Sequence, residues 1–302
     1  MKELIFTGSA VAMITPMCDD GSVNFAELKK MAEFQVESGT DALVVCGTTG
    51  ESATLEDDEH LECIRCVVEA VQGRVPVIAG TGSNNTAHAV MMSKEAAALG
   101  ADALLLVTPY YNKTSQAGLV KSFFTIADSS NLPAIIYNVP SRTGVNIQPE
   151  IALELSRHSM IRGLKEASGN IAQVVRIAAL CGEELPLYSG NDDQVVPLLS
   201  VGGKGVISVA ANVAPAQMHQ MCQLWFDGKT KESAAMQLEL SELCSALFCD
   251  VNPIPVKAAM NMLGWDAGDC RLPLVEPSEA NLARIEKALL DTGLLLFGIN
   301  LL

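Results

Sequence analysis

The chain has 302 residues, of which 49% are hydrophobic and 18% charged, with a formal net charge of −15. This composition excludes a disordered chain, because it supplies enough apolar surface for a sizeable core. The acidic balance argues against a nucleic-acid-binding protein, which needs clustered Lys and Arg. No stretch approaches the ~18 consecutive apolar residues of a membrane-spanning helix.

Short apolar runs alternate with helical patterns along most of the chain. Each run is continuously apolar, which is typical of parallel strands that are buried on both faces. Eight such runs predict eight strands, at residues 10–14, 42–46, 75–79, 103–107, 134–137, 161–165, 185–189 and 205–209.

A helical pattern follows every predicted strand. Eight strand–helix units fit the size of a TIM barrel, which typically has ~250 residues. A doubly wound sheet is the alternative, but Thr15-Pro16-Met17 after the first strand is not the Gly-rich turn of a dinucleotide site. The predicted helices span residues 24–38, 57–71, 86–99, 115–127, 149–157, 170–180, 192–200 and 215–226.

The pattern changes after Gly228, where helical segments at 229–248, 254–263 and 278–290 follow one another without a strand. The sequence therefore predicts an α/β protein with a (β/α)8 barrel as its catalytic domain in residues 1–228. A small C-terminal α-helical region occupies residues 229–302. Its apolar end, residues 294–302, is too short to span a membrane, and we expect it to pack on the protein or at a subunit contact.

The cysteines and histidines favour no metal site. The nine cysteines are odd in number and irregularly spaced, and the first residues do not resemble a signal peptide, so we expect reduced thiols and a cytoplasmic location. Cys63 and Cys66 have CxxC spacing, but they lie within a predicted helix and lack the second pair that structural zinc needs.

Lys165 is the clearest candidate for a catalytic residue. Active sites of TIM barrels form at the C-terminal ends of the strands, and Lys165 ends the sixth predicted strand. Burial there would lower the pKa of the amine, and a neutral amine can attack a ketone to form an imine. The alternative is a lysine that begins the loop and points into solvent.

Residues at neighbouring strand ends could assist this amine. Tyr137 ends the fifth strand and could relay protons if a second hydroxyl, such as that of Thr48, supports it. Backbone N–H groups in the Gly-flanked turn around Thr48 could hold a carboxylate, and Arg142 could bind a second one. The alternatives are a core aromatic, an ordinary tight turn and a surface arginine.

Taken together, these segments resemble the dihydrodipicolinate synthase family, in the pyruvate-dependent class I aldolase superfamily. The resemblance extends from about residue 7 to residue 295. The matching stretches are 47–55, 109–113, 137–144, 163–167, 189–192 and 252–257, the last of which begins with Asn252, a polar position of less certain role.

The resemblance implies a lyase of lysine (diaminopimelate) biosynthesis that condenses pyruvate with L-aspartate 4-semialdehyde. It implies a covalent imine between pyruvate and Lys165, no separate cofactor, and a homotetramer built from two tight dimers. The implied proton relay is Tyr137, Thr48 and Tyr111, with Tyr111 contributed across the dimer. The implied substrate-binding residues are Thr48, Thr49, Arg142, Gly190 and Ile207.

Two alternatives remain within this resemblance. N-acetylneuraminate lyase and 2-keto-3-deoxy sugar acid aldolases share the lysine and the tyrosine but differ in the loop after the tyrosine, and Ser141-Arg142-Thr143-Gly144 favours the synthase. A barrel that has lost catalysis and serves as a binding protein is the non-enzymatic alternative. Loss of Lys165, Tyr137 or Arg142 would indicate such a protein. All three residues are present, which favours an enzyme.

The resemblance also implies a candidate allosteric site. Lysine-inhibited members bind lysine at a dimer interface, but position 88 is His here where those members usually have Glu. A histidine does not replace the carboxylate that pairs with an ammonium, so we expect weak or absent inhibition unless Glu95 or another acid compensates. The positions of this site are Ser52, Ala53, His60, Asn84, His88 and Tyr110.

Overall fold

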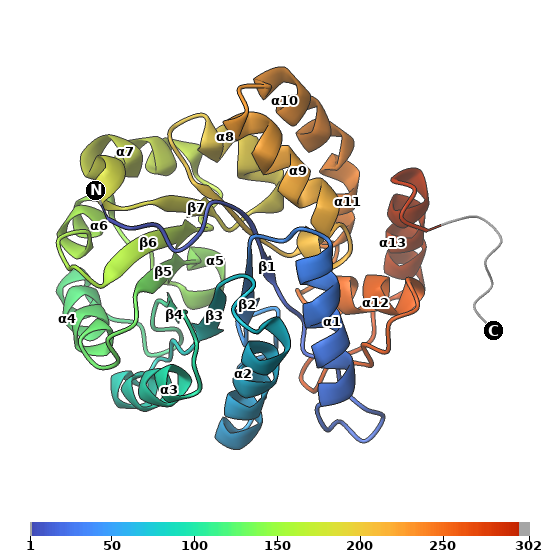
Figure 1. The fold of residues 1–302 in the computed structure, drawn as a ribbon, viewed down its shortest axis with the longest axis horizontal. Helices are drawn as coiled ribbons and strands as arrows, with labels where there is room; N and C mark the ends of the chain where they lie inside the picture. Colours follow the sequence, from blue (N-terminus) through green and yellow to red (C-terminus); the bar gives the residue numbers. More distant parts are fainter. Residues whose placement is uncertain (1, 296–302) are drawn as a thin grey trace.

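The computed structural model describes residues 2–295. Its centre is a closed barrel of parallel strands in the order β1 to β8, which confirms the predicted fold class (Figure 1). The strands are β1 (Gly8–Ala12), β2 (Ala42–Val45), β3 (Val77–Gly80), β4 (Ala103–Val107), β5 (Ala134–Asn138), β6 (Ile161–Glu166), β7 (Leu187–Ser189) and β8 (Gly205–Ser208).

Helices surround the barrel in Figure 1 and cover the outer face of its strands. Amphipathic periodicity placed most of them within two residues of their observed ends. They are α1 (Phe25–Glu37), α2 (Asp57–Val71), α3 (Thr86–Ala98), α4 (Gln116–Ala127), α6 (Pro149–Leu155), α7 (Ile171–Cys181), α8 (Val195–Leu199) and α9 (Pro215–Phe226).

The structure of the barrel differs from the prediction at the end of the first strand and after β5. The first strand ends at Ala12, although the apolar run continues to Ile14. Met13 and Ile14 are buried in the segment that follows, where the Ile14 amide donates to the Asn212 side chain at 3.1 Å. Residues 10–14 are apolar because all of them are buried, and this buried run continues for two residues after the strand ends. The other difference is a one-turn helix, α5 (Pro140–Thr143), that was not predicted.

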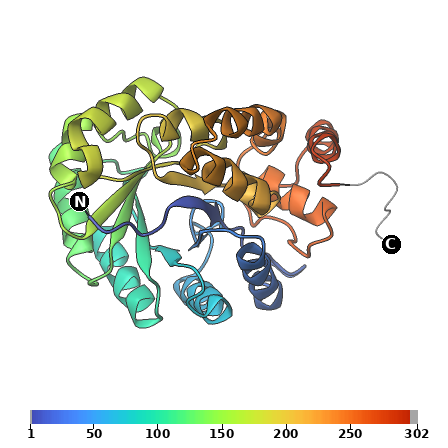
Figure 2. The same cartoon turned by 45° about the horizontal axis from the view of Figure 1, so that its top comes forward.

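The C-terminal region is helical. In Figure 1 its first helix lies beside α9, and its last two helices lie to one side of the barrel beyond α1, which Figure 2 shows from a second angle. Its predicted first helix is instead two helices that meet at Leu240. Leu294 and Leu295 pack against the core, and the rest of the apolar tail lies outside the described residues. The helices are α10 (Thr230–Glu239), α11 (Ser241–Ala246), α12 (Ile254–Met262) and α13 (Glu279–Asp291).

The core has two layers because successive side chains of a strand point to opposite faces. The outer layer joins the strands to the helices, and the inner layer fills the barrel. Many inner positions hold small residues such as Ala10 and Ala42, whereas Tyr188 stacks on Phe6 at 4.4 Å between ring centroids. Within residues 2–295, no helix is both long and apolar enough to cross a membrane.

Gly205→Ala tests how closely the barrel closes between β1 and β8. Gly205 pairs with Gly8 and has φ +150°, and a Cβ there would lie 1.8 Å from the Gly8 carbonyl oxygen. We expect the free energy of unfolding to fall by about 3 kcal/mol or more, from overpacking and backbone strain together.

Gly228→Ala is the matched control for this substitution. Gly228 also has a positive φ, +79°, but no atom lies within 4 Å of the added Cβ. Gly228→Ala should lower the free energy of unfolding by the backbone strain alone, about 1–2 kcal/mol. Equal losses for the two variants in denaturant unfolding would contradict the tight closure.

Candidate active site

Lys165 and Tyr137 are neighbours across two adjacent strands. They are register partners on β6 and β5, and both side chains lie inside the barrel, 5% and 7% exposed. The Lys165 Nζ lies 4.2 Å from the centroid of the Tyr137 ring. The structure therefore brings together the two residues on which the predicted imine chemistry depends.

Burial changes the acidity of the Lys165 amine. Desolvation lowers the pKa of Lys165 to about 8, since an ammonium is less stable away from water. The Arg142 charge acts in the same direction, and the Asp192 carboxylate opposes it. An amine with this pKa is partly neutral near physiological pH and is available as a nucleophile.

Tyr137 has a phenol suited to stay protonated at rest. Burial raises the pKa of Tyr137, while the charge of Arg142 and a side-chain hydrogen bond with Thr48 oppose that change. Thr48 is thus in contact with the phenol, as the proposed relay requires. A protonated phenol beside a hydroxyl can donate and recover a proton without leaving its place.

Thr48 and Thr49 lie in a tight turn directly after β2. The turn is closed by the Gly50 amide, which donates to the Gly47 carbonyl at 3.1 Å. A Cβ at Gly50 would lie 3.2 Å from the Cys46 backbone, a close contact that favours glycine there. Thr49 is buried, and its hydroxyl accepts a hydrogen bond from the Asn252 side chain at 3.0 Å.

Arg142 lies on the one-turn helix α5, and not in an irregular loop as expected. Pro140 begins this helix and Gly144 caps it in a left-handed conformation, with φ +68°. Pro at the start and Gly after the end of a helix are sequence signals that could have predicted it. The exposed Arg142 guanidinium donates to the Asn252 carbonyl at 3.1 Å, which fixes its position at the mouth of the site.

A cavity of about 630 Å³ connects most of these groups, whereas Thr48 lines a second cavity. Lys165, Tyr137, Thr49, Arg142 and Gly190 line the first cavity, and Ser241 and Cys244 show that α11 contributes to its rim. A Cβ at Gly190 would lie 3.1 Å from Lys165 Cε, so this glycine leaves room for the lysine side chain. Ile207 lies deeper, in the inner layer of the barrel.

Asp192 was not singled out by the sequence. Its Oδ2 accepts from the amides of Val209 and Ala210 at 3.0 and 2.8 Å, and its buried Oδ1 has no hydrogen-bond partner among the described residues. Burial raises the pKa of Asp192, and its hydrogen bonds and Lys165 oppose that change. The sequence shows two adjacent acids here, Asp192 and Asp193, and nothing in it shows which one is buried.

The second cavity, of about 350 Å³, contains most of the predicted allosteric positions. Ser52, Ala53, His60, His88 and Tyr110 line it.

Two histidines at this cavity have defined partners. His60 is buried and pairs with the Gly80 carbonyl at 2.8 Å, and His88 Nε2 lies 2.8 Å from Asp57 Oδ1. Asn84 does not line this cavity, and its backbone carbonyl accepts from the Asn112 side chain at 3.0 Å.

Tyr111 does not reach the Tyr137 phenol within one chain. Its ring is 92% exposed, and its backbone has φ +65°. In the described part of the chain, no group of three or more His, Cys, Asp or Glu side chains is placed to hold a metal ion.

Comparison with known proteins gives consistent matches over nearly the whole chain. The model of the dihydrodipicolinate synthetase family matches residues 5–291. A 4-hydroxy-tetrahydrodipicolinate synthase from Caldicellulosiruptor saccharolyticus is 55% identical over 290 residues, 96% of this chain and 98% of that protein.

Solved structures give the same result. Dihydrodipicolinate synthase from Thermotoga maritima is 40% identical with a TM-score of 0.94, over 96% of this chain and 100% of that one. The enzyme from Cyanidioschyzon merolae with lysine bound is 40% identical with a TM-score of 0.94, over 97% and 100%. Because the family model and these relatives cover almost all of the sequence, the chain belongs to the dihydrodipicolinate synthetase family.

Proposed function

We propose that this protein condenses pyruvate with L-aspartate 4-semialdehyde to give 4-hydroxy-tetrahydrodipicolinate, in the diaminopimelate route to lysine. The observation that carries this proposal is the buried Lys165 amine, with a pKa of about 8, beside the Tyr137 ring. The name of the Caldicellulosiruptor relative, a 4-hydroxy-tetrahydrodipicolinate synthase, supports the same reaction.

The first half of the reaction activates pyruvate. The neutral Lys165 amine attacks the ketone carbon, and the resulting carbinolamine loses water to become an imine. The hydroxyls and amides around Thr48 and Thr49 hold the pyruvate carboxylate. Tyr137, supported by Thr48, donates the proton that leaves with the water. The Tyr137 phenolate left by this transfer then takes a methyl proton, and the carbon of the resulting enamine is the nucleophile of the next step.

The second half joins the two substrates. Arg142 at the mouth binds the carboxylate of the semialdehyde, since a guanidinium pairs with a carboxylate through two parallel hydrogen bonds. The enamine carbon attacks the aldehyde carbon, and the aldehyde oxygen takes a proton through the Tyr137 relay. The amino group of the second substrate then attacks the imine carbon, closes the ring and releases the Lys165 amine.

The assembly and the location belong to the same proposal. We infer a homotetramer of two tight dimers, in which the partner subunit's Tyr111 completes the relay, and the exposed Tyr111 ring supports this. The electron sink is the imine itself, so the proposed reaction uses no separate cofactor. All nine cysteines are free thiols, which supports a cytoplasmic location.

Trapping with borohydride tests the imine directly. Incubation with pyruvate and borohydride should add mass to the peptide that contains Lys165, because reduction makes the bond permanent. Lys165→Arg should abolish the adduct, since a guanidinium stays protonated. Turnover assays with the semialdehyde and with N-acetylneuraminate then separate the synthase from its relatives. A folded, active wild-type protein without an adduct refutes the imine mechanism.

The pH profile tests the environment of Lys165. Because the amine must be neutral to attack, log kcat/KM for pyruvate should rise with pH and level off above about 8, the pKa of Lys165. The ionised Asp192 carboxylate raises that pKa, so Asp192→Asn should move the midpoint to lower pH. Asp193→Asn is the matched control: its carboxylate is exposed and screened by water, so the midpoint should stay in place. A rise in the midpoint for Asp192→Asn contradicts the assignment.

Dose–response with free lysine tests the second cavity. We expect half-inhibition only above about a millimolar, which corresponds to less than ~4 kcal/mol of binding. The reason is that His88 lies where a carboxylate is needed, and its ring already pairs with Asp57. His88→Glu should strengthen inhibition. The wild type could instead be half-inhibited below a millimolar. If Asp57→Asn then abolishes the inhibition, Asp57 supplies the carboxylate that binds the lysine ammonium.

A further inference from the structure

The loop that connects β2 to α2, residues 46–56, carries Thr48 and Thr49 in a conformation that needs external support. Glu51 has φ +54°, in the left-handed region that residues with a side chain rarely adopt. Such a conformation persists only where the surroundings fix it.

A buried ion pair fixes the Glu51 carboxylate. Its Oε1 accepts from Lys257 Nζ on α12 at 3.0 Å, and its Oε2 accepts from the Arg271 backbone amide at 2.9 Å. The two side chains are 1% and 2% exposed. Lys257 Nζ also donates to the Asp269 carbonyl at 2.7 Å. A buried charge that loses its partner is strongly unfavourable, so Glu51 stays bound to the C-terminal region.

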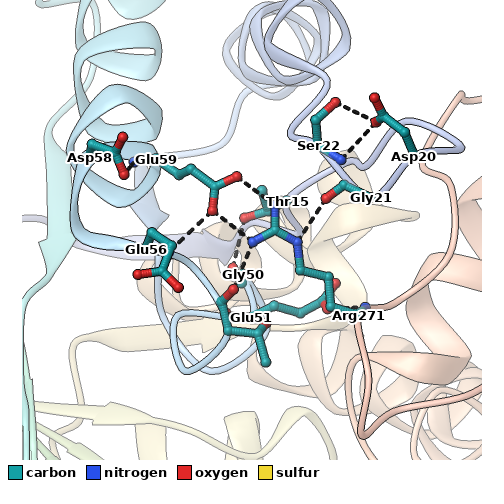
Figure 3. A network of polar contacts seen from close by, with 11 residues as sticks. Thr15, Asp20, Gly21, Ser22, Gly50, Glu51, Glu56, Asp58, Glu59 and Arg271 are labelled. Carbon is teal, nitrogen blue, oxygen red and sulfur yellow. Dashed lines mark hydrogen bonds and ion pairs between the residues drawn. The ribbon is translucent and has the colours of Figure 1, made fainter.

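The Arg271 side chain connects three further segments (Figure 3). Its Nε donates to the Gly21 carbonyl in the β1–α1 connection at 2.8 Å. Its Nη1 donates to the Thr54 carbonyl in the β2–α2 loop at 2.7 Å. Both terminal nitrogens reach the Glu59 carboxylate on α2, at 2.7 and 2.5 Å.

Glu59 itself belongs to the start of α2. Its Oε2 accepts from the Glu56 amide at 3.1 Å and forms half of a capping box. Arg271 therefore holds both the end of the loop and the helix that follows it. At the opposite end, the Thr15 hydroxyl donates to the Gly50 carbonyl at 2.7 Å, as Figure 3 also shows.

We propose that Glu51, Lys257 and Arg271 are positioning residues that hold Thr48 and Thr49 in the geometry that binds the pyruvate carboxylate. The inference rests on the proposed function. It assigns the C-terminal helical region a role in catalysis, because Lys257 and Arg271 hold the β2–α2 loop, whose Glu51 has a strained backbone conformation. Small displacements of binding groups reduce catalysis severely, by ~100-fold for about 1 Å.

Arg271→Lys tests the proposal. A lysine keeps the charge beside Glu59 but cannot reach Glu59, Gly21 and Thr54 together, because an ammonium is a point donor on a flexible stem. We expect the KM for pyruvate to rise about tenfold, with a smaller change in kcat. The midpoint of the pH profile should stay near 8, because burial, Asp192 and Arg142 set the pKa of Lys165 and none of the three depends on Arg271.

A second variant and a control complete the design. Glu59→Gln keeps the capping box but weakens the hold on Arg271, and it should raise the pyruvate KM by a smaller factor. Arg284→Lys is the matched control, since Arg284 joins Glu242 and Ser245 within the C-terminal region and does not touch the loop. Its pyruvate KM should match that of the wild type.

The outcomes separate this inference from the proposed function. If Arg271→Lys and Glu59→Gln lower thermal stability but leave the pyruvate KM within twofold of the wild type, the network is only structural and the inference fails. An equal rise in KM for Arg284→Lys also overturns it. Absence of a borohydride-trapped pyruvate adduct in the wild type would instead refute the proposed function.

Discussion

Removal of one lysine amine from water is the physical event on which this structure depends. An ammonium at Lys165 loses hydration inside the barrel, so its pKa falls to about 8. That burial needs a closed ring of strands around the amine, which β1 and β8 complete. It also needs space, which small inner side chains and Gly190 provide.

The groups around the amine are held by contacts from distant parts of the chain. Asn252 lies more than 200 residues after Thr49, yet its side chain donates to that hydroxyl and its carbonyl accepts from Arg142. Glu51 and Lys257 lie 206 residues apart in the chain and form a buried pair. The barrel thus positions Lys165 and Tyr137 through strand register, whereas the C-terminal region positions the binding loop.

Sequence patterns predicted the architecture well because it repeats. Eight apolar runs, each followed by an amphipathic helix, have few folded solutions other than a closed parallel barrel. The errors occurred where a local pattern has two physical causes. The apolar run at 10–14 reflected burial beyond the strand, and the Pro140 and Gly144 pair marked a short helix rather than a loop.

The sequence by itself determined the barrel, the placing of Lys165 and Tyr137 at adjacent strand ends, and the motifs that carry the family resemblance. These follow from local periodicity and from strand order. Only the tertiary structure decided which of Asp192 and Asp193 is buried, that Asn252 joins Thr49 to Arg142, and that Arg271 holds the β2–α2 loop. Such contacts depend on the three-dimensional path of segments far apart in the chain, and no local pattern encodes them.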